Sequence, residues 1–235
     1  MLILVVFHSC KRENMCDCIK RTGPIVTQQR PLNGFDEIFV EDNLDVFITQ
    51  DSAFEVVVEA GKNLRGMIIT EVIDGTLYIK NSNRCNWARS YKEPHNIYIK
   101  MPVIKYITSN GTGNIKSLNT ITTDSFEVRT ENSGNIELTV NNYLVTSHIH
   151  GAGDLTLHGT TKQHLCDIGS TAFLKCKDLQ TKHTVLQTLS TGLSYVNVSD
   201  NFECKIEELG DVYCYGNPKT VEKKMSGKGQ LFLNQ

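Results

Sequence analysis

Short segments in which apolar and polar residues alternate dominate the chain from residue 35 onward. Between residues 35 and 100 such segments occupy residues 35–40, 45–49, 55–59, 76–80 and 96–100. Successive side chains of a β-strand point to opposite faces, so each segment predicts a half-buried strand. Asp74-Gly75 separates two such runs and predicts a hairpin, because both residues tolerate positive φ. A pattern compatible with a helix is confined to residues 61–67.

Beyond residue 105 the pattern becomes a repeat of Gly, then Asn or Asp, then an aliphatic residue. Four clear copies are Gly113-Asn114-Ile115, Gly134-Asn135-Ile136, Gly153-Asp154-Leu155 and Gly210-Asp211-Val212. The first two intervals between the glycines are 21 and 19, and the interval from Gly153 to Gly210 is three times 19. We therefore expect two degenerate copies, at residues 171–173 and 194–196, and a last copy at residues 229–231. A period near 19 without helical patterning is typical of a β-solenoid, whose coils stack on one another.

The Gly-Asn and Gly-Asp positions of this repeat are predicted to be structural turns at the corners of the coils. Glycine adopts left-handed backbone conformations at little steric cost, so it would supply a left-handed turn at each corner. Asn and Asp side chains can hydrogen-bond to the backbone of the turns above and below them. We therefore predict that these residues have a structural role and not a catalytic or ligand-binding one.

Cysteine spacing supports the same period independently. Cys166 and Cys204 are 38 residues apart, and so are Cys176 and Cys214, which is two periods of 19. Equivalent positions two coils apart are separated by about twice the 4.8 Å strand spacing, beyond the reach of a disulfide. We expect four buried free thiols that pack as small apolar groups.

Composition and charge favour the same class of fold. The 235 residues include 18 Val, 19 Ile and 22 Thr but 5 Ala. β-Branched side chains pack well on sheets and Ala is the best helix former, so an all-β protein is predicted. The net charge is −2 and like charges do not form long runs. The chain therefore lacks the electrostatic pattern of a nucleic-acid-binding protein.

The N-terminal residues resemble the end of a bacterial lipoprotein signal peptide. Residues 2–7 (LILVVF) form an apolar run too short to span a bilayer, and Ser9, a small residue, precedes Cys10. This pattern predicts that residues 1–9 end a signal peptide, that Cys10 is lipidated, and that residues 10–24 form a tether. More than one acyl chain would hold the protein stably at a membrane. A buried first strand is the alternative interpretation.

Residues 81–95 interrupt the strand pattern and contain the single Trp of the chain. The candidate ligand-binding residues of this loop are Trp87, Tyr91, Arg84 and Arg89. Their rings and guanidinium groups could stack on and hydrogen-bond a sugar or a peptide. The alternative is that Trp87 folds back as an apolar plug over the end of the core.

The remaining cysteines suggest one cross-link. The sequence contains no Cys-x-x-Cys pair, so the usual zinc and thioredoxin spacings are missing. An exported chain can form disulfides, and we hypothesise one between Cys18 in the tether and Cys85 in the loop.

Four histidines between residues 148 and 164 raise the question of a metal site. His148 and His150 share one face of a predicted strand, and the 19-residue step from His164 to His183 predicts that these two stack in adjacent coils. Imidazole is a common transition-metal ligand, but no carboxylate cluster accompanies the histidines at an evident ligand spacing. Solvated strand faces, with no metal and no other cofactor, are therefore predicted. Calcium is also disfavoured, because calcium-binding solenoids repeat every nine residues.

Catalytic residues are not predicted anywhere in the chain. The regular acidic positions Asp154 and Asp211 would lie three coils apart, or about 14 Å. Carboxylate pairs in glycosidases are separated by about 5 to 9.5 Å. The sequence also lacks a Gly-x-Ser-x-Gly elbow and a Walker loop.

Several stretches of the chain form a recognisable set: residues 32–36 (LNGFD), 45–50 (DVFITQ), 70–79 (TEVIDGTLYI), 210–218 (GDVYCYGNP) and 226–229 (SGKG). Together they resemble the head GIN domain family, also described as auto-transporter adhesins and found chiefly in exported proteins and lipoproteins of Bacteroides-like bacteria. The resemblance covers residues 22–235 and implies a right-handed parallel β-helix with an adhesive or cell-envelope role. It supplies no catalytic residues. The chain departs from the family pattern at Thr171 and Ser194, which replace the usual Gly in the middle coils.

These observations predict an all-β protein in which a β-strand region, residues 25–105, precedes a right-handed β-solenoid, residues 106–235, within one continuous unit. We expect an exported outer-membrane lipoprotein, on the periplasmic or the cell-surface face, that functions in non-catalytic binding or adhesion. A glycan or an envelope protein is the expected partner, and homodimerisation through coil ends or faces is compatible with the fold. A purely structural envelope scaffold is the first alternative, and a glycan-active β-helix enzyme is the second.

Overall fold

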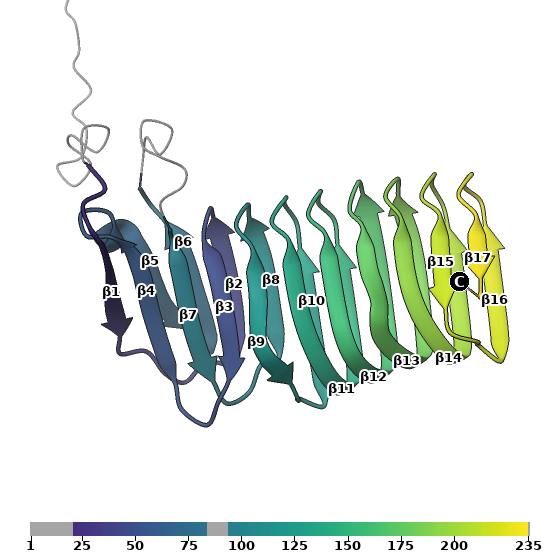
Figure 1. Ribbon diagram of the computed structural model, residues 1–235, viewed down its shortest axis with the longest axis horizontal. Helices are drawn as coiled ribbons and strands as arrows, with labels where there is room; N and C mark the ends of the chain where they lie inside the picture. The colour runs from purple at the N-terminus through teal and green to yellow at the C-terminus, as the bar shows by residue number, and fades with distance from the viewer. Residues whose placement is uncertain (1–20, 84–93, 235) are drawn as a thin grey trace, which may run out of the picture.

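The alternating segments form strands that wind around one apolar core as a flattened β-solenoid (Figure 1). The computed structural model describes residues 21–83 and 94–234. Within these residues the regular elements are strands apart from one 3₁₀-helix, η3 (Arg65–Met67). The predicted all-β solenoid is thereby confirmed. No helix in this part of the chain has the length and hydropathy needed to cross a membrane.

Each coil contributes one strand to each of two faces, and the core lies between them. In spatial order the first face consists of β5 (Ile68–Ile73), β6 (Thr76–Asn81), β2 (Glu37–Asp42), β8 (Tyr106–Gly111), β10 (Ser125–Thr130), the C-terminal parts of β11 (Ile136–Ile149), β12 (Leu155–Ser170), β13 (Leu174–Ser190) and β14 (Ser194–Ile206), and β16 (Thr220–Met225). The second face consists of β1 (Ile25–Arg30), β4 (Glu55–Gly61), β7 (Asn96–Met101), β3 (Asp45–Gln50), β9 (Ile115–Ile121), the N-terminal parts of β11 to β14, β15 (Val212–Tyr215) and β17 (Leu231–Leu233). Strands β11 to β14 span both faces because each continues around one corner without a break.

The predicted strands between residues 35 and 100 are confirmed, with aliphatic side chains on their inner faces. Ile38 in β2 and Ile48 in β3 are at most 1% exposed, whereas the residues between the inward positions face out. The predicted hairpin joins β5 to β6, and its turn residues Asp74 and Gly75 have φ of 49° and 83°. These positive angles are those that the Asp-Gly pair is suited to adopt.

The early strands are interleaved with the later coils and are not stacked in chain order. Strand β2 pairs in parallel with both β6 and β8, and β3 pairs in parallel with both β7 and β9. The β2–β3 coil therefore lies between the β6–β7 coil and the β8–β9 coil, although it precedes both in the sequence. Alternation identifies a strand and its inward face but not its neighbours, so this order could not be predicted.

The two ends of the core differ. At the N-terminal end the faces are extended by antiparallel strands, β4 beside β7 and β1 beside β4 on the second face and β5 beside β6 on the first, and Leu64 beside η3 is 1% exposed. At the C-terminal end, within the described residues, β16 pairs with β14 alone and β17 with β15 alone. The last coil therefore has open strand edges. The exposed charged residues of β16, Glu222, Lys223 and Lys224, are of the kind that discourages edge-to-edge pairing.

Glycines stack in a column at the corner where each coil passes from the first face to the second. A Cβ on Gly134 would overlap the carbonyl oxygen of Gly113, and a Cβ on Gly153 would overlap that of Gly134. None of these three residues has a positive φ, so the predicted left-handed turn is wrong. At Gly134 and Gly153 glycine is required instead because the backbone of the preceding coil approaches too closely to admit a side chain. The column continues through Gly192, Gly210 and Gly229.

The two degenerate corners lie at other residues than predicted. Ala172 and Gly192 occupy the column, because a Cβ on Gly192 would overlap the carbonyl oxygen of Ala172 and a Cβ on Gly210 that of Gly192. The predicted corners at Thr171 and Ser194 are therefore wrong by one and two residues. The coil that begins at Ala172 is one residue longer than the 19-residue period, and the coil that begins at Gly192 is one residue shorter. Counting in fixed steps therefore misses these corners.

The predicted hydrogen bonds between stacked corners are confirmed. The Asn135 side-chain oxygen accepts the backbone N–H of Asp154 at 2.9 Å, and the Asp154 carboxylate accepts that of Phe173 at 3.1 Å. The same bond joins Asp45 to the N–H of Asn114 and Asp211 to the N–H of Gln230, each at 2.8 Å. Corner N–H groups that face no strand thereby gain acceptors in the preceding coil.

The cysteine spacing is also confirmed. Cys166 pairs in register with Leu186, and Leu186 with Cys204, so the two cysteines lie two coils apart. Both are buried free thiols, as are Cys176 and Cys214. Burial raises the pKa of Cys204 to about 12 and that of Cys214 to about 11, which keeps these thiols neutral and unreactive at pH 7.

One histidine lies inside the core, contrary to the prediction that the histidines occupy solvated faces. His164 is fully buried and pairs in register with Thr184, not in a stack with His183, which pairs with Gln163. Its Nε2 lies 3.0 Å from the Ser147 hydroxyl, and its Nδ1 has no hydrogen-bond partner within the described residues. Burial lowers the pKa of His164 from 6.5 to about 4.

We predict that Gly153→Ala destabilises the protein by about 1–3 kcal/mol, because its Cβ must displace the backbone of the previous coil. Gly66→Ala is the matched control, since a Cβ there meets nothing within 4 Å. Urea denaturation of the two variants and the wild type measures the difference. Equal loss of stability in both variants would contradict the close-packed corner.

We also predict that stability falls as the pH is lowered from 6.5 to 4, in part because of His164. Over this range the unfolded imidazole binds a proton that the buried one excludes, so unfolding is favoured by about 3 kcal/mol at pH 4 relative to neutral pH. The double variant Ser147→Ala/His164→Leu removes both partners and should lose correspondingly less stability. Denaturation curves of the wild type and the double variant at pH 4, 5, 6 and 7 test this, and an equal loss of stability in both would contradict it.

Candidate functional site

The residues predicted to bind a ligand or a lipid lie outside the described part of the chain. They are Trp87, Tyr91, Arg84 and Arg89 in the loop between β6 and β7, Cys10 at the expected lipidation site, and the hypothesised Cys18–Cys85 pair. Their roles therefore stay predictions. The candidate sites below are built from the two faces and corners that the structure describes.

The acidic corner residues are engaged in structural contacts. Besides accepting the N–H of Phe173, Asp154 forms an ion pair with Lys175 at 2.7 Å. Asp211 accepts the N–H of Gln230. These carboxylates hold the corners together, which leaves them poorly placed to act as a general acid and base.

A polar groove follows the second corner of the coils, where β11, β12, β13 and β14 turn from the second face to the first. Its volume is about 440 Å³, and its lining consists of amides, hydroxyls and two ammonium groups: Asn141, Asn142, Thr160, Thr161, Lys162, Gln180, Thr181, Lys182, Asn197 and Ser199. The lining residues occupy equivalent positions in successive coils, with Asn141 beside Thr160 and Thr160 beside Gln180. We name this feature the corner groove.

Hydrogen bonding inside the corner groove is incomplete. Thr160 donates to the Asn141 side-chain oxygen at 3.0 Å, and Ser199 donates to the carbonyl oxygen of Thr181 at 3.1 Å. The Asn142 amide donates to the carbonyl oxygen of Thr123, but its Oδ1 is buried without a hydrogen-bond partner in the described protein. A buried acceptor left unpaired costs about 1–3 kcal/mol, so the hydrogen-bonding capacity of Asn142 is not fully used within the described protein.

The corner groove was missed in the sequence because its residues are ordinary polar types without a motif. Aligning the chain at the 19-residue period would have placed Asn141 beside Thr160, since their separation equals one period. The same alignment fails further on, where a register shift moves Gln180 one residue out of phase. The register shifts between coils therefore prevent a search at a fixed period from aligning the residues of the corner groove.

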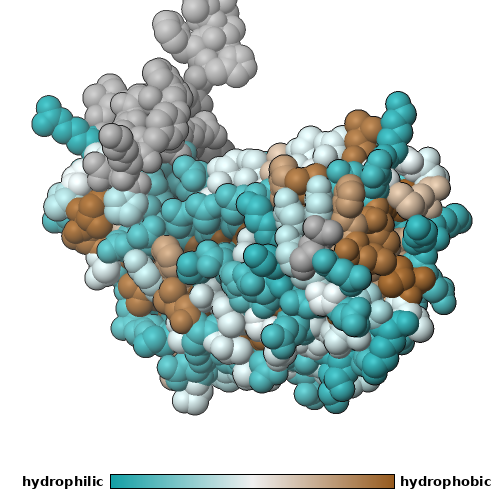
Figure 2. Space-filling model, turned by 45° about the vertical axis from the view of Figure 1, so that its right-hand side comes forward, coloured by the Kyte–Doolittle hydropathy of each residue, from teal (hydrophilic) through white to brown (hydrophobic). Residues whose placement is uncertain are grey.

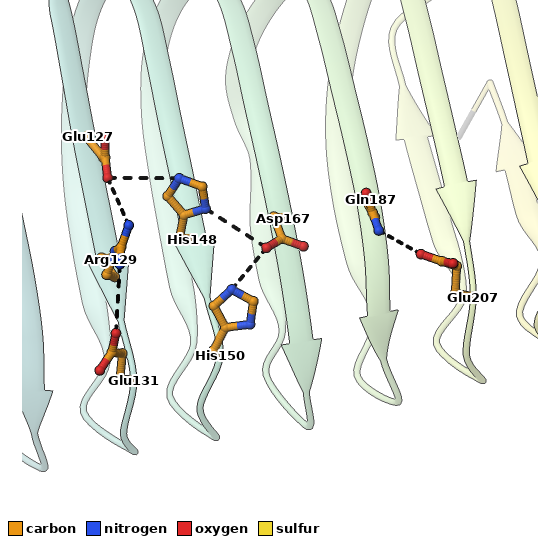
Figure 3. A network of polar contacts seen from close by, with 8 residues as sticks. All are labelled: Glu127, Arg129, Glu131, His148, His150, Asp167, Gln187 and Glu207. Carbon is orange, nitrogen blue, oxygen red and sulfur yellow. Dashed lines mark hydrogen bonds and ion pairs between the residues drawn. The ribbon is translucent and has the colours of Figure 1, made fainter.

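A polar network on the outer side of the first face contains two of the predicted surface histidines (Figure 3). His150 Nε2 lies 2.9 Å from Asp167 Oδ2, and His148 Nδ1 lies 3.9 Å from the same oxygen. His148 Nε2 lies 3.9 Å from Glu127 Oε1, which Arg129 contacts at 3.5 Å. Asp167 thus accompanies these histidines from the next coil, although no carboxylate cluster stands at an evident ligand spacing from them in the sequence. Asp167 follows His148 by one period of the repeat and lies opposite it in the next coil.

Aromatic rings stack along the outer side of the second face near the C-terminal end. The ring centroids of Tyr195 and Tyr213 are 5.4 Å apart, and those of Tyr213 and Phe232 are 4.9 Å apart. Figure 2 shows hydrophobic side chains gathered at this end of the molecule, where Met225 and Leu233 are also exposed. Because the ring faces cover one another, the stack stabilises the last coils more than it offers an open platform for a ligand.

Comparison with known proteins identifies related sequences and folds. A family model described as "Putative auto-transporter adhesin, head GIN domain" matches residues 34–218, well over half of the chain. No curated protein sequence matches the chain significantly.

Several solved structures share the fold at low sequence identity. A "putative adhesin" from Bacteroides fragilis is 18% identical, with a TM-score of 0.82, over 89% of this chain and 97% of that one. A "putative adhesin" from Parabacteroides merdae is 14% identical, with a TM-score of 0.64, over 92% and 98%. A "Putative lipid binding protein" from Parabacteroides distasonis is 20% identical, with a TM-score of 0.69, over 91% and 98%. At these identities the likeness establishes the fold alone.

Proposed function

The chain belongs to the head GIN domain family, and from this membership we propose that it is a non-catalytic binding protein of the cell envelope. In this proposal the solenoid is a rigid support that presents the corner groove to a glycan bearing an acidic group. The observation that carries the proposal is the lining of the groove: amides, hydroxyls and two lysines, with no carboxylate among them.

The chemistry of the corner groove matches this class of ligand. Side-chain amides and hydroxyls can donate to and accept from sugar hydroxyls. Lys162 and Lys182 add ammonium groups that would form charge-assisted hydrogen bonds with a carboxylate, sulfate or phosphate substituent. An acyl chain would desolvate these groups without pairing them. The polar lining therefore favours a glycan over a lipid of the kind suggested by the description of the Parabacteroides distasonis structure.

The rest of the molecule supports a binding role more than a catalytic one. Asp154 and Asp211, the regular acidic positions, are occupied by corner hydrogen bonds. The buried thiols of Cys204 and Cys214 are neutral at pH 7, because burial raises their pKa, and are poor nucleophiles. A rigid array of coils suits adhesion, since it fixes repeated side chains at a constant spacing.

A lipid on Cys10 would hold the protein at the outer membrane, with residues 10–24 as the tether to the solenoid. The membership in an adhesin-type family agrees with an exported protein that acts outside the cytoplasm. Residues 81–95, with Trp87, Tyr91, Arg84 and Arg89, are proposed as a second contact for the glycan or for an envelope protein. A homodimer, formed through the ends or faces of the coils, would present two such sites.

We predict that the full chain binds acidic glycans on an array and that Lys162→Ala/Lys182→Ala weakens binding about tenfold or more, because two charge-assisted contacts are lost. Lys116→Ala is the matched control, since Lys116 is an exposed lysine outside the groove, paired with Glu137. Trp87→Ala tests the loop separately. The array signal is followed by calorimetric titration with the strongest glycan.

The outcomes separate the candidate functions. If neither arrays nor pulldowns from envelope extracts retain a ligand, the structural scaffold is favoured over the binding protein. If binding is unchanged in the double-lysine variant but lost in Trp87→Ala, the loop and not the groove is the site. Turnover of a polysaccharide that disappears in Asp154→Ala would replace binding by catalysis.

We predict that Cys10→Ser abolishes metabolic labelling with a fatty-acid analogue and moves the protein from the membrane fraction to the soluble fraction. The reason is that the thiol is the proposed acylation site, and each lost methylene removes about 0.8 kcal/mol of membrane affinity. Cys16→Ser is the control and should stay labelled. Protease shaving of intact cells then distinguishes the cell-surface face from the periplasmic one.

A further inference from the structure

Strand geometry brings three metal-binding side chains to one point on the first face (Figure 3). His148 lies in β11, and His150 directly follows Ile149, the last residue of that strand. Ile149 is buried, whereas its neighbours His148 and His150 are half-buried and exposed, so both point outward. Asp167 of β12 is the register partner of His148. One ligand atom from each residue lies within 4.8 Å of the other two.

We propose that His148, His150 and Asp167 bind a divalent transition-metal ion of the Zn²⁺ class. Two imidazoles and a carboxylate are the donor set that such borderline ions prefer, whereas Mg²⁺ and Ca²⁺ require oxygen ligands throughout. Ligand atoms on tetrahedral Zn²⁺ lie about 3.3 Å apart, given bond lengths near 2.0–2.1 Å. The separations from Asp167 Oδ2, 2.9 Å to His150 and 3.9 Å to His148, bracket that value.

The backbone holds the three residues in place. Ile149 and Ile168, which follow His148 and Asp167, pair in register and are 0% exposed, so they anchor the outward side chains to the core. The N–H of His150 donates to the carbonyl oxygen of Thr130 at 2.9 Å, which fixes the end of β11. Binding therefore requires small side-chain rotations and no refolding, which favours affinity.

A second carboxylate stands behind one of the ligands. Glu127 lies on the far side of His148, with its Oε1 3.9 Å from Nε2, while His148 Nδ1 faces Asp167. A ligating imidazole usually donates its other N–H to a carboxylate or carbonyl, which orients the ring and strengthens the metal bond. Arg129 contacts the Glu127 carboxylate at 3.5 Å and so keeps it close to the ring. The side chains of His148 and His150 are 31% and 50% exposed, which leaves room for water as the remaining ligand.

The molecule contains its own control for this arrangement. His158 in β12 also lies between two carboxylates, at 3.8 Å from Glu137 and 3.9 Å from Asp178, and its side chain is 35% exposed. It has ion-pair partners similar to those of His148 but is not part of a comparable group of three ligands among the described residues. If a histidine with nearby carboxylates were enough to bind the metal ion, replacing His158 would weaken binding as much as replacing His150.

The test is calorimetric titration of the full chain with Zn²⁺ at pH 7.5, after its accessible thiols have been alkylated so that cysteine cannot compete. We expect one equivalent to bind and to raise the melting temperature. His150→Gln and Asp167→Asn, each of which removes one ligand with little change of shape, should weaken binding at least tenfold. His158→Gln should bind as the wild type does, and Mg²⁺ should give no heat.

The proposal is overturned if the alkylated wild type binds no Zn²⁺, or if His150→Gln and Asp167→Asn bind it as tightly as the wild type. It is also overturned if His158→Gln loses binding to the same extent as His150→Gln. Circular dichroism and the melting temperature without metal show that each variant is folded. Glu127→Gln should then reduce the affinity by about tenfold, because it removes the partner of the bound imidazole.

Discussion

The close approach of successive backbones at the glycine corner is the constraint on which the solenoid depends. At most levels the residue above a corner carbonyl oxygen is glycine, as Gly153 is above that of Gly134, because a Cβ there would overlap the oxygen; Ala172 is the exception. After three of the corner glycines an Asn or Asp then accepts an N–H of the next coil, as Asn135, Asp154 and Asp211 do. Tight stacking and the corner hydrogen bonds thus come from adjacent residues of one short motif, and together they fix the register of both faces.

Much of this fold could be predicted from the sequence because its determinants are local. Alternation identified the strands, Asp74-Gly75 identified the hairpin, and the cysteine spacing identified coils two layers apart. The position of the β2–β3 coil could not be predicted, because pairing with β6 and β8 joins segments far apart in the chain. The corners at Ala172 and Gly192 were missed for a related reason: coils of unequal length shift a fixed count by one or two residues.

The candidate sites were harder to predict because they arise between coils. Asn142, Lys162 and Lys182 have no motif in common, and they form a groove only once three coils are stacked. One period of the repeat separates His148 from Asp167, and this spacing becomes significant only when it is known that each period forms one coil and that both side chains face outward. For His164 the fixed period predicted a contact that does not exist. The register pairs it with Thr184 in the core, one residue away from His183.

Because the strand register fixes which side chains point inward, the residues that stabilise the core differ from those that are available to bind a ligand. Inward positions such as Ile149 and Ile168 maintain the stack, while their neighbours His148 and Asp167 can vary without disturbing it. Every coil is held at the same distance from the next, so each outward side chain lies at a fixed spacing from the equivalent side chains of the adjacent coils. Changing one outward residue therefore changes the surface at a defined position. Different members of a family could therefore share the fold at identities near 18% and still present different surfaces. The fold therefore predicts where binding residues can lie, on the outer faces and the corner groove, and the side chains present there determine which ligand they bind.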